Sequence, residues 1–151
     1  MSYFADISNQ FSTAQAVTAT AISANVIDTG PVTNNVLHDI TGSRPMWVRL
    51  WVSESFATAT SLTISLESDS TANLATSATV HATTGAIAIA NLTAGTMLYL
   101  RVPEERTYEQ YVGLRYTIGG SSATAGKITA VLTQERPIGD VMLFNDNITI
   151  A

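Results

Sequence analysis

Apolar and polar residues alternate with a period of two along most of the chain, and no long segment keeps the 3.6-residue period of a helix. The alternation is clearest in residues 61–68, where Leu62, Ile64 and Leu66 point to one side and polar residues to the other. This pattern is typical of a strand with one buried face. It predicts strands over residues 46–52, 61–68, 96–102, 111–118 and 127–133, and weaker strands over 16–28, 75–82, 86–92 and 147–150.

Turn-forming residues separate these runs. Residues 83–85, 94–95 and 119–122 have the composition of hairpin connections, and residues 104–110 are expected to form a single helical turn. Eight or nine short strands without alternating helices predict a sandwich, a barrel or a jelly roll. We expect one all-β domain. Its parts are an N-terminal arm (residues 1–15), a core (16–134) and a C-terminal arm or edge strand (135–151).

Charge and composition exclude several classes of protein. Twelve Asp and Glu residues outnumber seven Lys and Arg residues, and Lys127 is the only lysine, so the chain lacks the basic patch that nucleic-acid binding requires. It has no cysteine for disulfides. No apolar run approaches the roughly 18 residues of a membrane-spanning helix. The N-terminal sequence does not resemble a signal peptide, so we expect no export by that route.

The residue types that carry catalysis or metal binding do not form a recognisable pattern. His38 and His81 have no acidic or histidine partner at metal-ligand spacing. No GxSxG or phosphate-binding loop is present. Glu104-Glu105 is typical of a solvated turn. Asp140 and residues 145–147 are also typical of a polar turn, and calcium binding is the alternative for these later residues. We therefore expect a protein that is not an enzyme and needs no metal or cofactor.

Three groups of residues are candidates for a contact surface. The Trp47-Arg49-Trp51 face of the run MWVRLWV has the residue types of interface hot spots, and the alternative is that this face lies in the core. Both arms are rich in large apolar residues, and the alternative is that each arm packs on its own sheet edge. The arm residues are Tyr3, Phe4, Ile7 and Phe11 at the N-terminus and Met142, Leu143 and Phe144 at the C-terminus.

Three stretches together are similar to a known family. They are FSTAQAVTATA at residues 11–21, QYVGLRYT at 110–117 and GKITAVLT at 126–133. In this order they resemble the capsid cement (decoration) proteins of tailed phages, typified by that of a Bordetella short-tailed phage. The middle of the chain, residues 31–95, carries no matching hallmark.

The resemblance implies a jelly-roll-like antiparallel β-sandwich and no catalytic residues. It implies a homo-oligomer (dimer or trimer) made in the host cytoplasm. That oligomer would bind the outer capsid surface of the virion between subunits of the major capsid protein, without nucleic acid or membrane as a partner. The alternative is a jelly-roll module on the phage surface that binds a carbohydrate or a receptor.

Overall fold

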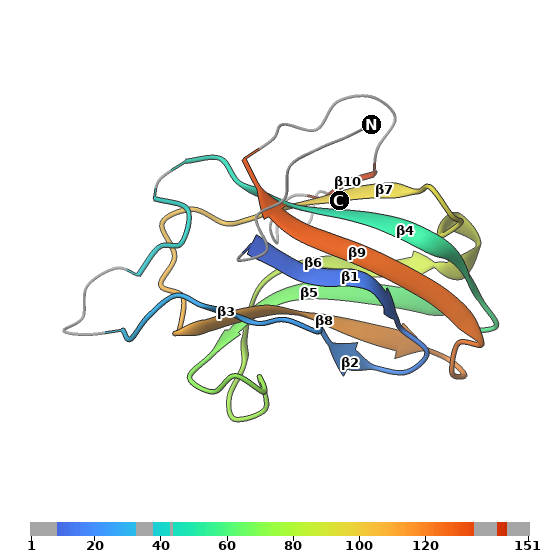
Figure 1. Cartoon of the computed structure of the whole chain (residues 1–151), viewed down its shortest axis with the longest axis horizontal. Helices are drawn as coiled ribbons and strands as arrows, with labels where there is room; N and C mark the ends of the chain where they lie inside the picture. The colour runs from blue at the N-terminus through green and yellow to red at the C-terminus, as the bar shows by residue number, and fades with distance from the viewer. Residues whose placement is uncertain (1–8, 33–37, 43, 135–141, 145–151) are drawn as a thin grey trace.

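Two β-sheets packed face to face form the molecule (Figure 1). The computed structural model describes residues 9–32, 38–42, 44–134 and 142–144. The first sheet has the order β1-β9-β4-β7-β10, and the second has the order β2-β8-β5-β6, with β3 also pairing with β8. All pairs are antiparallel except β10 with β7, which is parallel. The predicted fold class, an all-β jelly-roll-like sandwich in one domain, is confirmed.

The strands of the first sheet are β1 (Gln10–Ala16), β4 (Trp47–Ala57), β7 (Met97–Arg101), β9 (Ala125–Thr133) and β10 (Met142–Phe144). Those of the second sheet are β2 (Ala21–Ile22), β3 (Ile27–Asp28), β5 (Ser61–Asp69), β6 (Thr79–Ala88) and β8 (Tyr111–Gly119). A short 3-10 helix, η2 (Ile89–Asn91), follows β6.

The core lies between the sheets and is built from the apolar phase of each alternating run. Leu62, Ile64 and Leu66 of β5 are fully buried and face the apolar residues of β4, β7 and β9. Apolar side chains that alternate along strands of both sheets are thereby removed from water, which is the main stabilising contribution in a sandwich. The prediction that Leu62, Ile64 and Leu66 share one buried face is therefore confirmed.

The weaker predictions fail where glycines or turns interrupt a run. Residues 83–85 are not a hairpin connection but a bulge inside β6. Ser65 pairs with Thr83 and Thr63 pairs with Ala86, so β6 holds one extra residue, and Gly85 supplies the positive φ of 69°. Residues 16–28 form only two-residue strands, and the run over 86–92 ends in η2.

Residues 104–110 do not form the predicted helical turn. Tyr108 is fully buried, and its hydroxyl donates to the carbonyl of Pro103 at 2.6 Å. Its backbone N–H donates to the carbonyl of His38 at 2.9 Å. The buried ring and the two hydrogen bonds of Tyr108 hold this segment as a loop. A helical turn would point the Tyr108 side chain in another direction.

The predicted arms differ from the structure at Phe11. Strand β1 begins at Gln10 and pairs with β9, so residues 10–15 belong to the first sheet rather than to an arm. Phe11 is fully buried in the core and is not a contact residue for a partner, which corrects the prediction. At the other end, Met142–Phe144 form an edge strand. The remaining arm residues, and the strand predicted over 147–150, lie outside the described residues.

Candidate functional site

The face of the first sheet that points away from the core carries aromatic and basic side chains, and we call it the outer face. Trp47, Arg49 and Trp51 alternate along β4 with the core residues, so their side chains share this face. The strand register places a neighbour on either side of each of them. The resulting rows are Thr133–Trp47–Arg101, Val131–Arg49–Tyr99 and Thr129–Trp51–Met97.

Two cation–π contacts connect the basic and aromatic side chains of the outer face. The guanidinium carbon of Arg101 lies 5.3 Å from the centre of the Trp47 ring. That of Arg49 lies 5.6 Å from the ring of Trp51. Both distances are within the roughly 6 Å at which a cation is attracted to an aromatic face. Each tryptophan therefore carries an arginine, one from its own strand and one from β7.

Burial divides the outer face into a centre and a margin. Trp47 is 7% exposed, Arg49 5% and Val131 2%, whereas Trp51 and Met97 are partly exposed. In an antiparallel sandwich the face away from the core is usually polar and solvated. Here the centre is buried although it includes the charged Arg49, so only the margin of the outer face is open to a partner.

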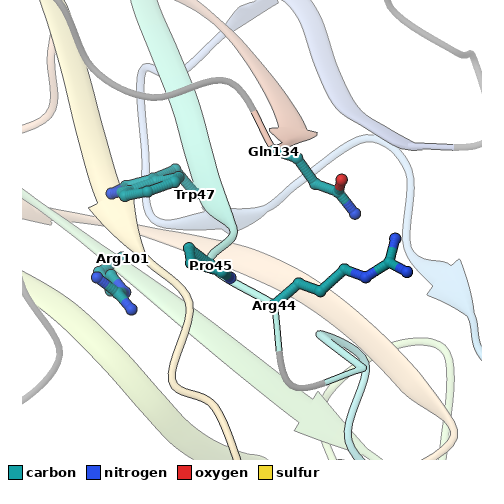
Figure 2. Close-up of a pocket in the computed structure, with 5 residues that line it drawn as sticks. All are labelled: Arg44, Pro45, Trp47, Arg101 and Gln134. Atoms are coloured by element: carbon teal, nitrogen blue, oxygen red, sulfur yellow. The ribbon is translucent and has the colours of Figure 1, made fainter.

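A pocket of about 490 Å³ lies at the edge of the outer face, where β4 begins and β7 and β9 end. Trp47 and Arg101 form one side, and Arg44 and Gln134 form the other (Figure 2). Pro45 lies between them. Arg101 also donates to a carboxylate oxygen of Glu104, which holds its guanidinium in place.

The structure shows where the tryptophan-bearing face lies, for which the sequence left two alternatives, a contact surface or the core. Trp47, Arg49 and Trp51 are brought together, but on the outer face rather than in the core between the sheets. Tyr3, Phe4 and Ile7 lie outside the described residues, and only the backbone of Met142–Phe144 is described.

Sequence reasoning missed several residues of this surface. Tyr99 and Arg101 were not predicted as part of it, although they alternate with the buried Leu98 and Leu100. Alternation alone assigns them to the outer face. Only the register shows that β7 lies beside β4.

A serine and a histidine also meet, on the second sheet. Ser68 Oγ lies 2.7 Å from His81 Nε2, and the backbone N–H of Glu109 donates to the same oxygen at 3.0 Å. Burial and the positive charge of Arg106 lower the pKa of His81 to about 4. Ser68 is fully buried, so a substrate does not reach this hydroxyl. The pair holds β5, β6 and the loop before β8 together.

The other candidate catalytic or metal-binding residues in the described part of the chain make structural contacts. His38 lies in a loop with Nδ1 2.9 Å from the carbonyl of Tyr108. Glu104 is paired with Arg101, and the backbone N–H of Glu105 donates to Asp39. In the described part of the chain no three His, Asp or Glu side chains gather as metal ligands, and no helix is long and apolar enough to cross a membrane. Asp140 and residues 145–147 lie outside the described residues.

The two sheets and the outer face define a single-domain β-sandwich protein of jelly-roll type with an aromatic and arginine-rich surface. The chain belongs to the Bbp16 family, whose model matches residues 11–132. The family name points to a Bordetella phage protein. No match was found among curated proteins.

Proposed function

We propose that this protein is a phage capsid cement protein, a non-enzymatic protein that binds the outer capsid surface between subunits of the major capsid protein and stabilises the shell. Membership of the Bbp16 family carries the proposal, because the family name points to a phage protein. The stretches at residues 11–21, 110–117 and 126–133 resemble cement proteins, and all but the last residue fall within the matched range.

The margin of the outer face supports a role in contacting another protein. Trp, Tyr, Met and Arg are the residue types enriched in protein–protein interfaces. Trp51, Met97 and Arg101 are partly exposed and lie on neighbouring strands of one rigid sheet. A sheet presents these side chains at fixed spacing, so their conformational entropy is already restricted before binding.

A cement protein needs several contacts at once rather than one strong contact. If one oligomer bridges neighbouring shell subunits, the second contact forms at a high effective concentration and the total affinity rises steeply. Closed cyclic symmetry is the usual form of a homo-oligomer. A dimer or trimer of this sandwich would therefore bind the shell firmly even with modest contacts from each copy.

The alternative, a carbohydrate-binding module, requires an open aromatic platform beside polar groups. Trp47 does not supply one, because it is 7% exposed and Arg101 lies over its ring. The outer face therefore favours the protein partner.

Binding of the purified protein to shells assembled without it tests the proposal. We expect the protein to co-sediment with the shells at many sites per particle and to raise the temperature at which they rupture. Shells that show neither bound protein nor a raised rupture temperature would contradict the proposed function.

A further inference from the structure

The pocket at the edge of the outer face has an unusual combination of lining groups. Two arginines and one glutamine line it: Arg101 lies beside Trp47 on one side of Pro45, and Arg44 lies near Gln134 on the other (Figure 2). None of the described residues that line it is a carboxylate. A net charge of −5 makes the chain acidic as a whole, so this pocket is a local concentration of positive charge on an acidic protein.

The two arginines differ in how far their charge is already neutralised. Arg101 is fixed by Glu104 and by its stacking on Trp47. Arg44 is exposed, and within the described ranges no carboxylate forms an ion pair with it. Its backbone N–H donates to the carbonyl of Thr41 at 3.1 Å, so a turn positions it beside the pocket. The pocket therefore retains positive charge and hydrogen-bond donors for a ligand.

The lining specifies the chemistry of that ligand. An arginine guanidinium presents its donors in a planar fork that matches a carboxylate. The indole of Trp47 and the ring of Pro45 favour an apolar group beside that carboxylate. The volume of about 490 Å³ accommodates a few side chains rather than a whole domain. A short peptide segment with carboxylates next to apolar residues fits all three properties.

We propose that this pocket receives an acidic segment of the major capsid protein, with a carboxylate at the exposed Arg44 and an apolar side chain against Pro45 and the edge of Trp47 that lines the pocket. The identity of the partner rests on the proposed function; the preference for an acidic peptide rests on the pocket alone. Docking at this edge would bring the open margin of the outer face, Trp51 and Met97, toward the shell.

A peptide experiment tests the pocket without any shell. The probe is acetyl-Asp-Leu-Glu-Leu-Asp-amide, and the control peptide carries Asn and Gln in place of Asp and Glu. We expect the acidic peptide to shift the indole N–H resonance of Trp47 more than that of Trp51, the two being assigned with the Trp51→Phe variant. Arg44→Glu is expected to weaken this binding at least about tenfold, because like charges repel across a contact.

The matched control is Arg106→Glu, which makes the same change of charge at an exposed arginine that does not line the pocket. It is expected to change peptide affinity less than about twofold. The inference is overturned if Trp47 does not shift at millimolar acidic peptide, or if both peptides shift it equally. Equal losses in the two variants, or tighter binding of oligogalacturonate than of the peptide, would also overturn it.

Shell binding separates this inference from the proposed function. If the wild-type protein binds shells and Arg44→Glu binds them within twofold of it, the pocket inference fails and the cement function stands. If the acidic peptide binds but the wild-type protein does not bind shells, the proposed function fails, and with it the capsid protein as the occupant. Shell binding lost in Arg44→Glu and kept in Arg106→Glu is the result expected here.

Discussion

At the scale of single residues, the buried carboxylate of Glu67 is held by donors from neighbouring side chains. The side chain of Glu67 is 5% exposed, and Arg115 Nε donates to its two oxygens at 3.1 and 3.0 Å. Ser65 Oγ donates to Oε1 at 2.9 Å. A second nitrogen of Arg115 donates to the carbonyl of Leu74 at 2.6 Å, which ties the β5–β6 loop to β8.

Replacing Arg115 with alanine is expected to lower the free energy of unfolding by about 3 kcal/mol, because it leaves a buried carboxylate without its cation. Urea denaturation measures this change. The matched control is Lys127→Ala, which removes a half-exposed pair with Glu54 and is expected to lower the free energy of unfolding much less than Arg115→Ala does. Similar losses in both variants would show that the Glu67–Arg115 pair is not a buried structural contact.

His81 gives the protein a pH dependence of known sign. Its pKa is lowered to about 4 in the folded protein, chiefly by burial, from 6.5 in the unfolded chain. Between these values the unfolded chain binds the proton more readily, so stability falls as pH decreases from about 6.5 to 4. His81→Gln keeps a polar group near Ser68 but does not titrate. Denaturation curves should show a smaller loss over this interval in the variant; identical losses would contradict the assignment.

At the scale of elements, one glycine fixes how β9 passes the end of β4. Gly126 has a φ of 140°, and a side chain there would overlap the ring of Phe56. Gly126→Ala is therefore expected to destabilise the fold by about 2 kcal/mol or more, through backbone strain and overpacking. Gly42 is the control, because its φ is 58° with open space around it. The midpoint temperature of thermal unfolding should be well above that of Gly126→Ala in the Gly42→Ala variant. The reverse order of the two temperatures would contradict this account.

The same scale shows how far the sequence predicts this fold. Period-2 alternation predicted β4, β5, β7, β8 and β9, because the burial of one face of a strand requires apolar residues at every second position. It did not predict β1, which was assigned to an arm, or the continuous strand β6. It did not predict the bulge at Gly85 or the extended loop at Tyr108, because each depends on what packs against it from a distant segment. The alternation also placed Trp47, Arg49 and Trp51 on one face. It could not show that Arg101 and Tyr99 lie beside them, or that Arg44 and Gln134 line a pocket there. Those placements depend on the register of β4 with β7 and β9.

At the scale of the whole molecule, charge and surface are unevenly arranged. The chain carries a net charge of −5, whereas Arg44 and Arg101 line one pocket at the edge of the outer face. Such a distribution favours one orientation of approach to an acidic surface. We therefore expect the first sheet to face the shell and the second sheet to face the solvent.

Cryo-electron microscopy of the phage particle that carries this chain is the most direct test of the cement function. The account predicts density for the two-sheet sandwich at many symmetry-related sites on the outside of the shell, between major capsid protein subunits and with the outer face of the first sheet toward them. Density confined to the tail, or a shell without this sandwich, would contradict it.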